Sequence, residues 1–164
     1  MTIQELLRLE FDEEAANTRK MLERVPDASL TWKPHEKSMT LGRLASHIAD
    51  LPMRSATIIG TETYVRPMGA TPFAAGSNQE LLEHFDSAAA EAKKTLDGLR
   101  DEDLAAVWTM KMGDRVMVSL PRAMALRRVF MDHLIHHRGQ LSVYLRLLDV
   151  AIPGMYGPSA DDAR

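Results

Sequence analysis

Apolar residues recur every three or four positions along most of this chain, and this spacing constrains the fold more than any other feature. Residues at this spacing share one face of an α-helix, so each such stretch predicts an amphipathic helix with an apolar side to bury. We predict four helices, over residues 3–24, 40–60, 77–98 and 121–148. Four amphipathic helices bury their apolar faces against one another, which predicts an all-α four-helix bundle.

Capping residues and prolines mark the limits of these helices. Ser77 with Glu80 three residues later has the pattern of a capping box at the start of the third helix. Pro52 lies inside the second helical pattern and has no backbone N–H, so the carbonyl of Ile48 loses its usual partner. We therefore predict a kink or an interruption directly after His47.

Two long connections separate the predicted helices. Residues 61–76 are rich in Pro and Gly and are predicted to form a long crossing loop. Residues 107–120 change to a period of two around Gly113, which predicts a small β-hairpin before the last helix. Pro121 suits the first turn of that helix, and the tail 151–164 is predicted to be irregular. The whole chain of 164 residues has the length of a single domain.

The composition argues against several classes of function. The net charge is −3 with no basic block, so nothing favours nucleic acid or an anionic membrane as a partner. No apolar stretch approaches the roughly 20 residues of a membrane span, and no signal peptide is visible, so we expect a cytoplasmic protein. The chain contains no cysteine, so a metal would need His, Asp, Glu or water as ligands. Any thiol chemistry would need a thiol from outside.

Two histidines lie one turn apart on the same face of the last predicted helix. His133 and His137 fall in its apolar stripe, between Phe130 and Leu141. Burying two imidazoles without partners is costly, and histidines at i and i+4 can converge on one divalent metal ion. For such a pair taken alone, the alternative is a pair of core histidines with hydrogen-bond partners.

His47 is the third ligand that the spacing favours, because it lies near the inward side of the second predicted helix. His35 lies in a loop. His84 is about 60° from the apolar stripe of its own helix, and His136 is about 60° from His133 on the last helix. We expect His84 to be exposed and His136 to form a hydrogen bond at the edge of the bundle. Asp50 is a candidate to orient an imidazole, with a solvated carboxylate as the alternative.

Three further side chains are candidate substrate contacts. Gln140 and Tyr144 share the face of the two histidines, with hydrogen bonding in the core as the alternative. Trp32 is either a plug over the end of the bundle or part of a pocket wall. Arg138 points about 140° away from His133, which favours a salt bridge or a dimer contact over catalysis.

These segments resemble the DinB/YfiT-like superfamily over nearly the full chain. The similarity rests on Leu-Gly-Arg-Leu-Ala-Ser-His-Ile-Ala at 41–49, His-Leu-Ile-His-His-Arg-Gly-Gln-Leu at 133–141, and the ending at 153–161. It implies a four-helix bundle of up-down-down-up topology that is frequently a homodimer. It also implies a divalent metal bound by three histidines, here His47, His133 and His137. Some members are thiol-dependent transferases or isomerases, and many have no established reaction.

Three neutral imidazoles would leave an ion with its full positive charge and at least one open position. Nickel and zinc are the expected metals, and iron also accepts imidazole. We predict a transferase in which an external low-molecular-weight thiol binds as thiolate and attacks a small-molecule substrate. The alternatives are a metal-dependent hydrolase and a non-enzymatic, stress-associated bundle that the ion braces. No H-E-x-x-H motif or carboxylate pair supplies a general base, which favours thiol chemistry.

Overall fold

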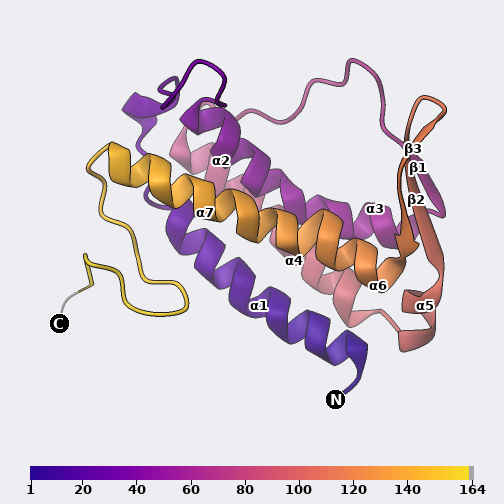
Figure 1. The fold of residues 1–164 in the computed structure, drawn as a ribbon. Coiled ribbons are helices and arrows are strands. Elements are labelled where there is room, and N and C mark those ends of the chain that lie inside the picture. The colour runs from indigo at the N-terminus through magenta and orange to yellow at the C-terminus, as the bar shows by residue number, and fades with distance from the viewer. Residues whose placement is uncertain (163–164) are drawn as a thin grey trace.

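Long helices dominate the structure, a computed structural model that describes residues 1–162 (Figure 1). The first is α1 (Ile3–Leu22), followed by α2 (Leu41–Asp50), α3 (Arg54–Gly60) and α4 (Asn78–Asp97). The last helical stretch consists of α6 (Arg122–Ala125), a π-helical turn η3 (Leu126–Met131) and α7 (Asp132–Leu147). Helices α1 and α2 each pack against both α4 and α7. The prediction of a mostly helical protein is confirmed.

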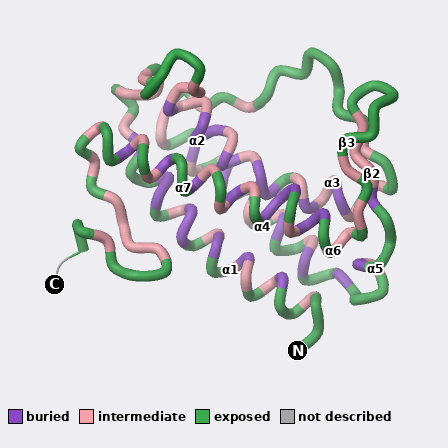
Figure 2. Tube along the Cα trace, in the orientation of Figure 1, coloured by how far each residue is buried: buried purple, intermediate pink, exposed green. Residues whose placement is uncertain are grey.

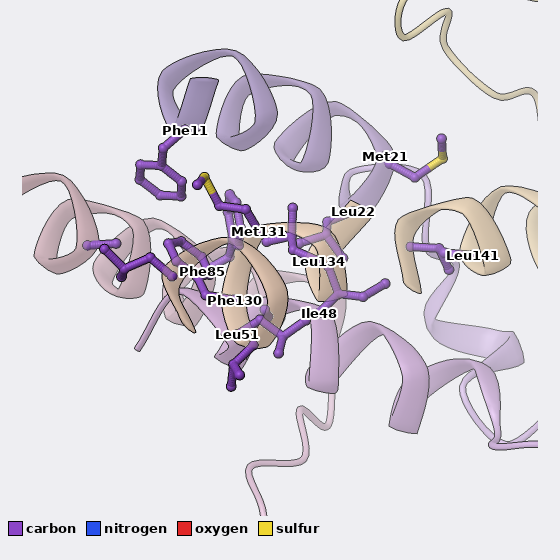
Figure 3. Packing of buried hydrophobic residues seen from close by; sticks show 14 of the residues in the cluster. Phe11, Met21, Leu22, Ile48, Leu51, Phe85, Phe130, Met131, Leu134 and Leu141 are labelled. Atoms are coloured by element: carbon purple, nitrogen blue, oxygen red, sulfur yellow. The ribbon is translucent and has the colours of Figure 1, made fainter. Parts of the chain in front are cut away.

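The core lies between these helices, as the buried inner faces in Figure 2 show. Phe11 of α1 and Phe130 of η3 meet with their ring centroids 5.2 Å apart, and both are almost completely buried. Ile48, Leu51 and Phe85 extend the same cluster from other helices (Figure 3). This cluster places one end of α2 directly against the last helical stretch.

Polar side chains begin two of the long helices. At α1, the Thr2 hydroxyl accepts from the Glu5 N–H and the Glu5 carboxylate accepts from the Thr2 N–H, which completes a capping box. At α4, the Ser77 hydroxyl accepts from the Glu80 N–H. The Glu80 carboxylate accepts from the N–H of Gly76 instead of Ser77, so the predicted capping box forms only in part.

The second predicted helix is interrupted, as expected, at Pro52. A single 3₁₀ turn, Leu51–Met53, separates α2 from α3. The carbonyl of Ile48 accepts a hydrogen bond from the N–H of Leu51, which replaces the bond that Pro52 cannot donate. The interruption begins four residues after His47 and leaves α2 intact around it.

The predicted hairpin is present and carries a third strand. Strands β2 (Val107–Met112) and β3 (Arg115–Pro121) pair in antiparallel fashion, with Gly113 at a φ of 57° in the turn. Strand β1 (Thr63–Val65) pairs parallel to β2, so the prediction of a loop throughout residues 61–76 is wrong. A three-residue strand is too short for its period to be recognised in the sequence.

Two smaller features near the sheet also differ from the predictions. Pro121 is the last residue of β3 and lies before the first turn of α6, because its extended backbone (ψ 143°) still continues the strand. The short helix α5 (Asp101–Ala105) follows α4 and was not predicted, since five residues carry too little apolar pattern. No helix in residues 1–162 is long and apolar enough to cross a membrane.

The π-helical turn η3 rotates the last helix. Compared with an unbroken α-helix, a π-turn adds one residue, which turns the following residues by about 100°. The buried positions of α7 are Leu134, Arg138, Leu141 and Leu145. Leu141 belongs to the predicted stripe, whereas each of the other three lies one residue after a predicted position. His133 and His137 lie at the margin of the buried face, half-buried, and the prediction that they lie inside it is wrong.

Candidate metal site

The three histidines proposed as ligands lie together, His47 on α2 and His133 and His137 on α7. One ligand nitrogen of each ring lies within 4.8 Å of the other two. The Nε2 atom of His133 is 3.3 Å from that of His47 and 2.8 Å from that of His137. A tetrahedral ion with Zn–N bonds of 2.0–2.1 Å holds its ligand nitrogens about 3.3 Å apart. The separation between His47 and His133 matches this value, and that between His133 and His137 is shorter. The cluster could therefore hold a metal ion.

The start of α2 is fixed against the preceding loop, which sets the direction of His47. Thr40 caps the helix by accepting from the N–H of Arg43. The N–H of Gly42 donates to the carbonyl of Leu30 at 2.9 Å. A Cβ atom on Gly42 would lie only 3.0 Å from that carbonyl oxygen, so this close approach favours glycine.

The protein environment keeps these imidazoles neutral. Burial, followed by the nearby His137 and His133, lowers the pKa of His47 to about 3. Burial and then the positive charge of Arg54 lower the pKa of His133 to about 4. Burial also lowers the pKa of His137. Neutral imidazoles carry the free lone pair that a metal ligand needs, so an ion would not have to displace protons at neutral pH.

The lowered pKa values predict a pH dependence for the metal-free protein. An unfolded chain takes up protons on these histidines below about pH 6.5, whereas the folded protein does not until about pH 4. Since the unfolded state binds more protons in this window, stability should fall as the pH falls from 7 toward 5. Thermal denaturation at pH 7 and pH 5 measures this change, and the drop should be smaller in His47→Gln. An equal drop in both proteins would contradict the assignment of the stability loss to this cluster.

Gln140 contacts the outer nitrogen of His137. Its Oε1 atom lies 2.7 Å from His137 Nδ1, so the Nδ1–H donates to the amide oxygen and Nε2 keeps its lone pair. The Nε2 atom is the one that faces the other two histidines. Gln140 thus positions His137 through this hydrogen bond, and its role as a substrate contact stays a prediction.

Removing this contact should weaken metal binding. Loss of a group that orients a ligating histidine typically costs 10–100-fold in metal affinity, and we expect a decrease of that size in Gln140→Leu. Competition with a chromophoric chelator measures the affinity. The matched control is Gln79→Leu, on the exposed surface of α4, which should bind metal as the wild type does. Equal affinity in both variants would contradict this role.

The remaining aromatic candidates pack against each other. Trp32 and Tyr144 form an edge-to-face pair with centroids 5.7 Å apart. The Tyr144 hydroxyl donates to the carbonyl of Met39 at 3.3 Å. These contacts connect the loop before α2 to the later part of α7. They favour a role for Trp32 as a plug over the end of the bundle and not as part of a pocket wall. For Tyr144 they favour hydrogen bonding within the protein.

The other histidines do not join the cluster. His84 is half-buried, and the expectation that it is exposed is wrong, because its ring stacks on Phe73 at a centroid distance of 3.7 Å. Its Nε2 atom is 3.0 Å from Asp50 Oδ1, so this carboxylate contacts His84 and not a member of the triad. His136 is exposed, with its ring centroid 4.9 Å from that of His137.

Comparison with known proteins places the chain in a family. Residues 10–141 match the profile of the DinB superfamily. The chain belongs to the DinB superfamily. This DinB protein is 28% identical over 159 residues to the uncharacterized protein YrdA of Bacillus subtilis, a match that covers 91% of this chain and 85% of YrdA.

Two solved structures share the fold of this DinB protein. A DinB-like protein from Bacillus cereus superposes with a TM-score of 0.72 at 23% identity, over 92% of this chain and 95% of that one. The DinB-like protein YjoA from Bacillus subtilis gives a TM-score of 0.70 at 20% identity, over 92% and 96% of the two chains. At such identities the likeness establishes the fold alone.

Proposed function

We propose that this DinB protein is a divalent-metal-dependent transferase that joins an external low-molecular-weight thiol to a small-molecule electrophile. The observation that carries the proposal is a cluster of three neutral, half-buried imidazoles with their Nε2 atoms converging, in a chain without cysteine. When bound, nickel or zinc would supply a positive charge that favours the thiolate form of a small thiol. The protein's own part is to hold the three imidazoles neutral and oriented.

The surroundings of the cluster support thiol chemistry over hydrolysis. A hydrolase of the H-E-x-x-H kind uses a carboxylate as general base within hydrogen-bond reach of the attacking water. Within residues 1–162, the histidine cluster includes no carboxylate. Asp50, three residues after His47, is hydrogen-bonded to His84. Coordination by itself favours loss of the proton from a thiol, and this chain would have to take that thiol from outside because it contains no cysteine.

The proposal extends to the connectivity and assembly that the family resemblance implies. We infer the up-down-down-up order for the four long helical stretches, in which α1 and α2 each pack against both α4 and α7. A homodimer is the proposed assembly. Size-exclusion chromatography with light scattering measures the mass, and a value of about twice 18.3 kDa is expected.

A thiol and electrophile screen tests the activity. Metal-free protein is loaded with Zn²⁺ or Ni²⁺ and given 2-mercaptoethanol, cysteine or glutathione with alkyl halides and epoxides. In the reaction a sulfur–carbon bond forms, the carbon–halide or carbon–oxygen bond breaks, and the thiol proton goes to solvent or to the opened epoxide. Mass spectrometry detects the thioether. We expect turnover that requires metal and thiol and that His47→Ala lacks.

Other outcomes would point to the alternative functions. Ester cleavage without any thiol, lost in His47→Ala, would replace the transferase with a hydrolase. A sharp drop in thermal stability on chelation, with no thiol-dependent or ester turnover after reloading, would make the ion a structural brace. Either result would contradict the proposed reaction.

A further inference from the structure

The outward face of α7 carries no formal charge along most of its length. Between Asp132 and Arg146 the sequence contains a single Asp, Glu, Lys or Arg, which is Arg138, and this residue is buried. The exposed residues of this stretch are His136, Gly139, Gln140 and Val143. The exposed faces of α1 and α4, by contrast, include charged residues such as Glu13 and Lys94. Depletion of charged residues is typical of the centre of a protein–protein interface.

A glycine and two large apolar side chains lie on this face. Val143 and Leu147 are 56% and 59% exposed. Gly139 lies in the middle of α7, and a Cβ atom added there would meet no atom within 4 Å. Glycine in the interior of a helix is unfavourable compared with alanine. No contact within residues 1–162 accounts for a glycine here, whereas the close approach of a helix from outside would account for it.

The charges at the two ends of this face are opposite in sign and equally far from Gly139. Asp132 precedes Gly139 by seven residues and Arg146 follows it by seven, so all three lie on one side of the helix. Their side chains are 54% and 46% exposed, although each also contacts a residue of its own chain, Arg127 and Asp161 respectively. An identical helix that runs in the opposite direction would bring Asp132 beside the partner's Arg146, and the twofold symmetry repeats this pair. The face is therefore complementary in charge to itself.

We propose that two copies of this chain associate through α7, with the two helices antiparallel and the two Gly139 residues facing each other at the twofold axis. The absence of a Cβ atom at the axis lets the two backbones approach closely. At the edge of the face, Gln140 is hydrogen-bonded to His137, so this interface adjoins the candidate metal site. The inference rests on the homodimer proposed above and names its surface, and it does not depend on the thiol reaction.

A large side chain at position 139 tests this interface. Gly139→Leu should separate the two copies, and it should remain folded because leucine favours the helix more than glycine does. Circular dichroism checks the folding. Ala16→Leu, at an exposed position of α1, is the matched control. Light scattering at one protein concentration should give about twice 18.3 kDa for the wild type and Ala16→Leu, and about 18.3 kDa for Gly139→Leu.

Disulfide formation tests the antiparallel arrangement. The chain contains no cysteine, so Gly139→Cys introduces one thiol, which should lie beside the same thiol of the other copy. Oxidation of dilute protein with diamide should convert most of Gly139→Cys, and little of Ala16→Cys, to a covalent dimer on a non-reducing gel.

The outcomes separate the interface from the assembly and from the reaction. A dimeric Gly139→Leu, or no more disulfide in Gly139→Cys than in Ala16→Cys, would overturn the inference and leave the homodimer to another surface. A monomeric wild type would overturn both the interface and the homodimer. Thioether formation is measured separately, so its failure would overturn the proposed reaction and not this interface.

Discussion

Each of the variants His47→Ala, His133→Ala and His137→Ala is expected to retain less than about a tenth of the metal bound by the wild-type protein. The three rings converge on one point, so removing any of them leaves only two imidazoles for an ion. His136→Ala should keep its full metal content, because that side chain is exposed and lies outside the cluster. Elemental analysis after dialysis against metal-free buffer measures the content.

The His136 variant is the matched control, since it removes the same side chain from the same helix. Circular dichroism should show all four variants folded, because the triad lies at the margin of the buried face. Equal metal content in all four purified variants would contradict the assigned ligand set.

Arg138→Ala is expected to destabilise the protein by about 3–5 kcal/mol, because it would leave a buried carboxylate without its counter-ion. Arg138 Nη2 lies 2.6 Å from Glu14 Oε2, and these side chains are 3% and 6% exposed. The guanidinium also donates to the Thr18 hydroxyl and to the hydroxyl of Tyr156 in the tail. Urea denaturation measures the change in the free energy of unfolding.

Two further proteins separate charge burial from loss of packing. The double variant Glu14→Gln with Arg138→Met removes both charges and keeps most of the volume, so it should lose less stability than Arg138→Ala. Arg128→Ala, at an exposed position of η3, should change stability by no more than about 0.5 kcal/mol. A loss of less than about 1 kcal/mol in Arg138→Ala would show that this ion pair contributes little.

The helical elements were predictable because their apolar residues keep a constant period and their ends carry capping groups. The meeting of His47 with His133 and His137 was also anticipated, since all three follow the inward side of strong helical patterns. For α7, the apolar pattern predicted the helix itself but not all of the residues that it buries. Its pattern was read as an unbroken α-helix, and the π-turn η3 moves the buried face by one residue.

That one-residue shift explains why the predicted burial of residues at the site was wrong. It moves Arg138 into the core, where the sequence anticipated its salt bridge but not its burial. It also moves His133 and His137 to the margin, where an outside molecule can reach them. Single π-turns are rare inside α-helices, so the apolar pattern alone predicts an unbroken helix.

X-ray absorption spectroscopy of the protein, purified without chelators or metal-affinity steps, shows which ion the histidine cluster binds and which atoms surround it. We expect about one nickel, zinc or iron ion per chain, with three imidazole nitrogens in its coordination shell. A chain that binds no divalent ion in stoichiometric amount, or an ion whose shell contains no imidazole, would contradict it.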